Sequence, residues 1–300
     1  MEQVLRIRNL CKKYPGFQLQ DVSFTVEKGM IMGFIGRNGA GKTTTLKSVM
    51  KLVHPDSGEI SFFGLEPGEK EQEIKRRIGY AAGGISYYHR KKTEEIVRMT
   101  KTFYPGWGET ACRHYMEKFS LEPGKRLREL SEGMKVKFNL MLALSHGAEL
   151  LILDEPTSGL DPVSREELLE IFLDLAASGV SILFSTHITS DLDKCADAIT
   201  YIRKGQILAS ERTGAFLERY RLAAVSGELT SAQRELALGV RRCKEGRTAL
   251  ILKEQEELFR GLRGNGSDSS LPGEIQVMPA DLEAVMVHLE GGADQHEAIG

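Results

Sequence analysis

A glycine-rich loop followed by lysine and threonine is the strongest chemical signal in this 300-residue chain. The loop fits the pattern GxxxxGK[ST] and follows the apolar run 30–35, which predicts a buried strand, then the loop, then a helix over 42–50. In such a loop the backbone N–H groups turn inward around phosphates, the lysine adds positive charge, and the helix N-terminus adds a partial positive charge. The predicted nucleotide-binding residues are Gly36, Arg37, Asn38, Gly39, Ala40, Gly41, Lys42, Thr43 and Thr44.

Two carboxylates end a second apolar strand, predicted over 150–153. Next to the glycine loop, Asp154 is expected to hold the Mg²⁺ bound by the Thr43 hydroxyl, and Glu155 is expected to face a water in line with the terminal phosphate. An Asp-Glu pair at a strand end is often only a helix cap or a solvated turn, so the loop upstream is what favours the catalytic interpretation. His187, after the next strand, is predicted to contact the same phosphate, although a lone histidine is more often incidental.

The elements that must position these residues alternate between strands and helices. Predicted strands lie at 4–9, 19–26, 30–35, 59–63, 150–153, 180–185 and 198–203, and predicted helices at 42–50, 162–177 and 190–196. Strand–helix–strand repetition predicts a parallel sheet with ligands at the carboxyl ends of its strands. Residues 71–144 show helical spacing instead, which predicts a helical insertion in the α/β core.

Signals weaken after residue 205. A helix at 213–222, a strand at 249–252, a Gly/Ser-rich stretch at 261–270 and a helix at 280–289 predict a small α/β appendage. The predicted organisation is a main domain over 1–220 with a helical subdomain at about 85–145, an appendage over 221–290, and a disordered tail over 291–300.

Composition excludes several classes of protein. A formal net charge of -2 without a basic block gives no support to nucleic acid as the main partner. The four cysteines are scattered without a CxxC pair, which argues against a zinc site, an iron–sulfur cluster or a disulfide framework. The N-terminus lacks a signal-peptide pattern, and the longest apolar stretches, 138–144 and 150–153, are too short to cross a bilayer. Any membrane role is therefore expected to come through a partner.

A third motif, Leu130-Ser131-Glu132-Gly133-Met134, lies between the loop and the carboxylate strand. With this motif, residues 1–220 resemble the ATP-binding cassette (ABC) ATPases, the engines of membrane transporters. The resemblance rests on the loop at 36–43, the signature-like segment 130–134, Asp154-Glu155, the segment Ser158-Gly159-Leu160-Asp161, His187, and Tyr14 upstream of the loop. The implied fold is a P-loop NTPase with a parallel-sheet core, an N-terminal antiparallel β subdomain, a helical insertion and a small C-terminal α/β appendage.

The resemblance implies ATP and Mg²⁺ as cofactors and a site shared between two cassette subunits, identical or different. Tyr14 would stack on adenine. Ser131 and Gly133 would contact the terminal phosphate of ATP bound to the second ABC ATPase subunit, and Asp161 would lie at the same dimer seam. An integral membrane permease subunit would hold the chain at the cytoplasmic, inner face of the cell membrane, with the helical insertion as the coupling surface.

Two positions depart from the family pattern. The signature usually reads LSGGQ, and here Glu132 and Met134 replace the second glycine and the glutamine; Ser131 and the Gly133 backbone can still donate hydrogen bonds. Such cassettes also carry a glutamine after a strand like 78–80, and here Gly83 takes that position. We expect Gly83-Gly84 to act as a flexible hinge.

A second level of resemblance favours export. The segment 85–93, the motif Phe103-Tyr104-Pro105-Gly106-Trp107, the signature form and the C-terminal segment 281–286 resemble bacterial export cassettes for peptides, antibiotics and lipid-like molecules. The aromatic residues at 103–107 also fit a plain core role, because buried aromatics are common.

Three other functions compete with the transporter ATPase. A cassette acting on nucleic acid or ribosomes usually has two cassettes, a coiled-coil insertion or a basic arm, and this sequence has none of them. A regulatory cassette with weak turnover is opposed by Glu155 and His187 and favoured by Gly83. A small-molecule P-loop kinase leaves segment 130–134 without an explanation.

Overall fold

The computed structural model describes residues 2–68, 70–82, 88–244, 246–262 and 275–296. The chain divides into two compact units, Met1–Ser210 and Glu211–Gly300. The sequence predicts this boundary at residue 220, whereas the structure has it after Ser210. It lies earlier because the strand over 220–226 pairs with strands of the second unit and not with the first.

A three-stranded antiparallel sheet begins the first unit, in the order β2-β1-β4. Its strands are β1 (Gln3–Tyr14), β2 (Phe17–Glu27) and β4 (Ser57–Phe62). The tight turn Pro15-Gly16 joins β1 to β2 and places Tyr14 opposite Phe17. Gly16 has φ of 79°, a left-handed conformation that favours glycine. The predicted N-terminal antiparallel β subdomain is confirmed.

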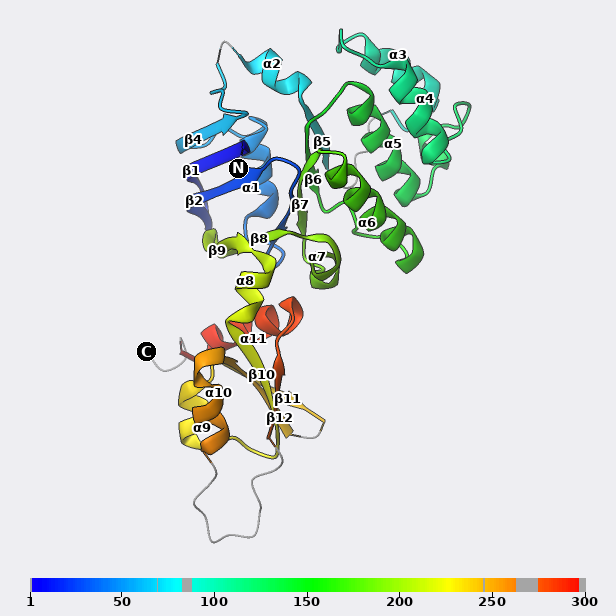
Figure 1. The fold of residues 1–300 in the computed structure, drawn as a ribbon. Coiled ribbons are helices and arrows are strands. Elements are labelled where there is room, and N and C mark those ends of the chain that lie inside the picture. The colour runs from blue at the N-terminus through cyan, green and yellow to red at the C-terminus, as the bar shows by residue number, and fades with distance from the viewer. Residues whose placement is uncertain (1, 69, 83–87, 245, 263–274, 297–300) are drawn as a thin grey trace. The chain divides into compact units, whose positions relative to one another are not determined.

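A six-stranded sheet in the order β5-β6-β7-β3-β8-β9 carries the predicted α/β core (Figure 1). Its strands are β3 (Ile31–Ile35), β5 (Ile78–Ala82), β6 (Leu150–Asp154), β7 (Ser181–Thr186), β8 (Ala198–Arg203) and β9 (Gln206–Arg212). The pairs among β5, β6, β7, β3 and β8 are parallel. Every residue of β3, β6 and β7 is buried, as expected for parallel strands covered on both faces. The predicted parallel-sheet core is confirmed.

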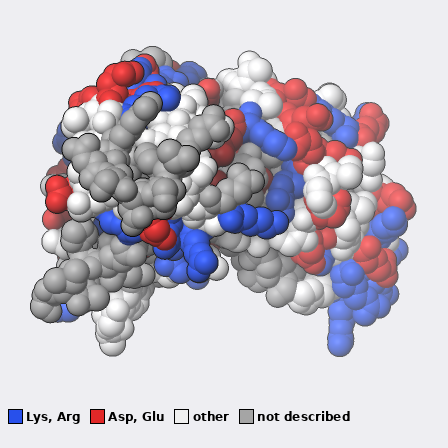
Figure 2. Space-filling model, turned by 90° about the horizontal axis from the view of Figure 1, so that it is seen from below, with Lys and Arg blue, Asp and Glu red and all other residues white. Residues whose placement is uncertain are grey.

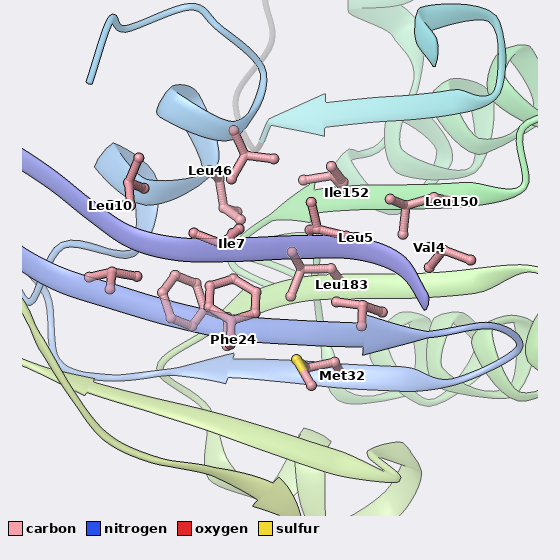
Figure 3. Packing of buried hydrophobic residues seen from close by; sticks show 14 of the residues in the cluster. Val4, Leu5, Ile7, Leu10, Phe24, Met32, Leu46, Leu150, Ile152 and Leu183 are labelled. Carbon is pink, nitrogen blue, oxygen red and sulfur yellow. The ribbon is translucent and has the colours of Figure 1, made fainter. Parts of the chain in front are cut away.

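The two sheets of the first unit share one hydrophobic core (Figure 3). Leu5 and Ile7 of β1 meet Ile152 and Leu183 of the parallel sheet, with Leu46 of helix α1 (Lys42–Val49) beside them (Figure 3). Fully burying a side chain of this size stabilises the fold by about 1.5–3 kcal/mol. Because residues of both β3 and α1 pack in this core, the core holds the loop between them in place.

The remaining helices of the first unit fall into two groups. The insertion contains α2 (Glu71–Arg76), α3 (Thr93–Lys101), α4 (Glu109–Lys118), the short helix η1 (Leu127–Glu129) and α5 (Glu132–Ser145). The others are α6 (Pro162–Ala177) and α7 (Thr189–Cys195). Figure 1 shows α3, α4 and α5 gathered on the β5 side of the unit, and α5 packs on β5. Gly83 and Gly84, the predicted hinge, lie outside the described residues.

The second unit has a four-stranded antiparallel sheet in the order β11-β12-β10-β13. Its elements are α8 (Thr213–Glu218), β10 (Tyr220–Ser226), α9 (Ser231–Leu236), β11 (Gly239–Cys243), β12 (Gly246–Leu252), the short helix η2 (Lys253–Gln255), α10 (Glu256–Gly261), β13 (Ile275–Pro279) and α11 (Leu282–His296). The β-α-β-β-α-β order from β10 to β13 is that of a split βαβ motif. Its core includes Ala223, Val225, Ile251 and Phe259.

Two predictions for this unit are wrong. The helix predicted over 213–222 ends at Glu218, because the following residues form β10 between β12 and β13. The tail predicted to be disordered from residue 291 is helical as far as His296, because α11 continues through it.

Charged side chains of both signs are interspersed on the described surface seen in Figure 2. Many pair locally, as Arg77 does with Glu149 at 2.6 Å between Nε and Oε1. The pairing fits the small net charge of the chain. Among the described residues, no helix combines the length and the apolar character needed to cross a membrane.

Candidate functional site

The glycine loop lines a cavity of about 610 Å³, within the usual size range of small-molecule sites. The loop connects the end of β3 to the start of α1, so the core described above holds both of its ends. The lining residues are Gly16, Phe17, Arg37, Asn38, Gly39, Gly41, Lys42, Thr43, Thr44, Glu155, Ser158 and His187. Loop residues, Glu155 and His187, which are far apart in the sequence, therefore meet at one cavity.

Glycine is required in the loop for two different reasons. Gly39 and Gly41 have φ of 82° and 116°, the left-handed region that other residues avoid. A Cβ on Gly36 would lie 2.3 Å from the carbonyl oxygen of Ile202, so that position has no room for a side chain. The backbone N–H groups of such a turn can line a concave site for an anion.

The hydroxyl of Thr43 and the carboxylate of Asp154 meet at this site. Thr43 Oγ1 donates to Asp154 Oδ1 at 3.2 Å, and Ser185 Oγ donates to the same oxygen at 2.6 Å. Sequence reasoning missed Ser185, which ends up next to Asp154 because β6 and β7 are paired. Hydroxyl and carboxylate oxygens are suitable ligands for Mg²⁺, which keeps several waters and shares phosphate oxygens. The described residues contain no group of three or more His, Cys, Asp or Glu side chains that could hold a metal alone.

Glu155 is the centre of the polar contacts in the cavity. Its Oε1 lies 3.1 Å from Lys42 Nζ, and its Oε2 lies 2.8 Å from Nδ1 of His187. Lys42 Nζ also donates to the Gly36 carbonyl at 2.7 Å. Glu155 has φ of 52°, and its N–H donates to Ser185 Oγ at 3.0 Å. This strained backbone turns the carboxylate out of the strand direction toward the glycine loop.

Phe17 lines the cavity, and Tyr14 is not among the described lining residues. A Cβ on Gly41 would come within 3.0 Å of Phe17 Cζ, so the Phe17 ring lies against the loop. Tyr14 is 38% exposed, and Lys12 Nζ lies 5.6 Å from its ring centre. Tyr14 and Phe17 are cross-strand neighbours beside the tight turn. The sequence predicts a role for Tyr14, whereas Phe17 is the aromatic residue that lines the cavity.

Ser131, Gly133 and Asp161 form a second cluster, outside the described lining of the cavity. Ser131 begins α5, and its hydroxyl accepts the N–H of Met134 at 3.2 Å. Asp161 begins α6 and accepts the N–H of Ser164 at 3.1 Å and its hydroxyl at 2.6 Å. A Cβ on Gly133 would lie 3.4 Å from Ser164 Cβ, so the two helix N-termini are in contact.

Comparison with known proteins shows which family this chain is similar to. Residues 19–158 match the family described as ABC transporter. The chain is 34% identical over 206 residues to the ABC transporter ATP-binding protein YtrB of Bacillus subtilis (strain 168), covering 68% of this chain and 70% of that protein. It is 34% identical over 212 residues to the bacitracin transport ATP-binding protein BcrA of Bacillus licheniformis, covering 69% of each.

The fold agrees with the sequence matches. A solved structure of an ATP binding subunit of an ABC transporter superposes with a TM-score of 0.64 at 30% identity, covering 71% of this chain and 91% of that one. The resemblance inferred from the motifs is confirmed: the chain belongs to the family of ABC transporter ATP-binding proteins.

Proposed function

We propose that this chain hydrolyses ATP with Mg²⁺ at the cavity around Glu155 and supplies the energy to a membrane transporter. The observation that carries the proposal is the position of Glu155, whose two carboxylate oxygens contact Lys42 and His187 at the glycine loop. Family membership supports nucleotide hydrolysis, and this arrangement supports the assignment of residues to it.

Each residue of the cavity has a task in the proposed reaction. The loop N–H groups and Lys42 bind the phosphates, and Thr43 and Asp154 would hold Mg²⁺, which would offset negative charge during phosphoryl transfer. Glu155 accepts a proton from the attacking water. His187 holds the Glu155 carboxylate from the other side and contacts the terminal phosphate.

The second cluster completes the site across a dimer. Ser131 and Gly133 lie at the start of α5, whose N–H groups carry the partial positive charge of a helix N-terminus. We assign them to the terminal phosphate of ATP bound by a second subunit, with Asp161 beside them at the seam. Contact between Gly133 and Ser164 supports a shared movement of the α5 and α6 starts.

The proposed membrane partner is a permease subunit that binds the helical insertion. Large apolar side chains are exposed there, including Tyr88, Met99 and Phe103, the last with 76% of its surface exposed. BcrA, which is named for bacitracin transport, supports a proposal of export of a peptide-like or lipid-like molecule. The chain would then lie at the cytoplasmic face of the cell membrane.

A double-mutant cycle on Glu155 and His187 tests the hydrolysis proposal. We expect Glu155→Gln to lower kcat by roughly 10²- to 10⁴-fold, the range of a general base. His187→Ala should lower kcat through the same step, so the double variant should be little worse than Glu155→Gln alone. The measurement is phosphate release at saturating MgATP, with and without a chelator.

Lys194→Met is a control, because Lys194 is on the helix that follows His187 and its ion pair with Glu166 is about half exposed. It should have the rate of the wild type. Wild-type turnover in Glu155→Gln, or full independence of the two substitutions, would contradict the assignment.

A further inference from the structure

A buried carboxylate lies four residues after His187 and has no role in the reaction described above. Asp191, in the first turn of α7, is only 1% exposed. Its Oδ1 lies 4.0 Å from Nε of Arg165 on α6. Arg165 also donates from Nη2 to the Leu160 carbonyl at 3.5 Å.

The pair is held without full hydrogen bonding. Among the described residues, Asp191 Oδ2, Arg165 Nε and Thr157 Oγ1 are buried and have no partner within hydrogen-bonding distance. Burial raises the pKa of Asp191, and the smaller effects of the nearby Thr157 hydroxyl and the Arg165 charge lower it. A buried carboxylate that lacks full hydrogen bonding is costly, and the Arg165 side chain, which is 29% exposed, lies 4.0 Å from it, so the pair points to a reason other than stability.

The positions of the three residues in the chain suggest that reason. Thr157 follows Glu155 by two residues, Arg165 follows Asp161 by four, and Asp191 follows His187 by four. The cluster therefore joins the segments that carry the proposed base, the proposed dimer contact and the proposed phosphate contact. We propose that Asp191 and Arg165 are positioning residues. Through their contact, the position of the α6 start at Asp161 determines the position of the His187 side chain.

The inference rests on the proposed role of His187. The ion-pair distance of 4.0 Å is longer than a hydrogen bond, so the two charges attract each other without being locked in one geometry. Movement of the α6 start on contact with a second subunit changes this distance. Because Asp191 lies in the first turn of the helix that follows His187, the same movement shifts the imidazole relative to Glu155.

The same two helices carry a natural control. Lys194 of α7 and Glu166 of α6 form an ion pair whose side chains are about half exposed. Exposed pairs of this kind contribute little. Glu166→Gln therefore removes a charge from the same interface, one residue from Arg165, and this charge has only the smallest of the electrostatic effects on the pKa of Asp191.

The test compares Asp191→Asn, Arg165→Gln and the double variant with Glu166→Gln and wild type. For each we would measure kcat for MgATP hydrolysis and, separately, the dissociation constant for ATP. Asp191→Asn should lower kcat by about tenfold to a hundredfold, the cost of a small misplacement at a reacting centre. ATP affinity should stay within about twofold, because neither residue lines the cavity.

Compared with Arg165→Gln, the double variant should recover part of the lost kcat, because it no longer leaves the buried charge of Asp191 without its partner. Arg165→Lys keeps the charge and should stay close to the wild-type rate. If Asp191→Asn does not fold, the difference between Arg165→Lys and Arg165→Gln carries the test alone, since only the charge differs greatly between them.

Several results would overturn the inference. One is a wild-type kcat in Arg165→Gln, and another is an equal loss of kcat in Arg165→Lys and Arg165→Gln. A loss of kcat in Glu166→Gln equal to that in Asp191→Asn, or a fall in ATP affinity that matches the fall in kcat, would also overturn it. Parallel measurement of kcat in His187→Ala separates failure of this inference from failure of the proposed role of His187. If His187→Ala is inactive and the cluster variants are active, only this inference fails; if His187→Ala is active, the assignment of His187 fails and the inference fails with it.

Discussion

Lys42 is the residue on which we expect nucleotide binding to depend most directly. Its side chain is 5% exposed, and its ammonium group lies between the Gly36 carbonyl and the Glu155 carboxylate. A buried cation that faces a cavity offsets phosphate charge in a medium that screens it weakly. Lys42→Ala should therefore abolish tight ATP binding, as measured by titration calorimetry, while Lys47→Ala on the same helix should bind like wild type. Unchanged affinity in Lys42→Ala would contradict the placement of phosphates at the loop.

At Phe17 the geometry of the cavity differs from the prediction made from the sequence, which named Tyr14 as the aromatic residue. The aromatic ring that lines the cavity is Phe17, while Tyr14 lies one cross-strand position away. Base–aromatic stacking is worth about 1–3 kcal/mol per base, or roughly 5- to 150-fold in affinity. Phe17→Ala should raise the dissociation constant for ATP by that factor and leave the constant for inorganic triphosphate unchanged. A larger loss in Tyr14→Ala than in Phe17→Ala would return the base contact to Tyr14.

At the scale of elements, the starts of α5 and α6 have a structural role as helix caps and, as we propose, a functional role in the dimer. Ser131 caps α5 through the N–H of Met134. Ser131→Ala should cost about 1 kcal/mol of stability through the lost cap, and it should also reduce ATPase activity through the lost phosphate donor. Thr230→Ala is the matched control, since Thr230 caps α9 in the same way in the second unit. Urea unfolding and phosphate release together check the prediction, and equal activity in the two variants would contradict it.

The extent to which elements could be predicted follows from their physical signals. Helix α6 and strand β8 have the bounds expected from the sequence, because Pro162 and Asp161 mark a helix start and β8 is rich in β-branched and aromatic residues. Strands β11 and β13 and helices α9 and α10 were missed. Each has seven residues or fewer, and their stability comes from pairing and packing that no local pattern displays.

The candidate site shows the same limit. The glycine loop, Asp154, Glu155 and His187 carry local signals, and their meeting follows from parallel strands ending at one edge. Ser185, Phe17 and Asp191 have no signal of their own. Ser185 and Phe17 reach the site only through the pairing of β6 with β7 and the tight turn of β1 and β2, and Asp191 meets Arg165 only through the packing of α7 on α6.

At the scale of the whole molecule, buried histidines link stability to pH. His146 stacks on Tyr104 with ring centres 3.9 Å apart, and burial lowers its pKa below the ordinary value. The folded state therefore favours the neutral ring. Its contribution to stability is complete above the unfolded pKa of about 6.5 and is lost as pH falls through the lower folded pKa.

We expect acidification from about pH 7.5 to about pH 5.5 to lower the free energy of unfolding of the first unit. His146→Phe keeps an aromatic ring beside Tyr104 and cannot titrate, so its stability should fall less over the same range. Urea unfolding followed by far-UV circular dichroism at both pH values measures the difference. An equal fall in both proteins would exclude His146 as the cause.

In the proposed mechanism, two cassette subunits close around ATP, and Glu155 then activates the water that hydrolyses it. The most direct measurement is the mass in solution of Glu155→Gln with MgATP, with MgADP and without nucleotide, by sedimentation velocity. Slow hydrolysis should trap a dimer with MgATP alone, and adding Lys42→Ala to Glu155→Gln should leave the protein monomeric. A monomer in all three conditions, combined with wild-type turnover, would contradict the account.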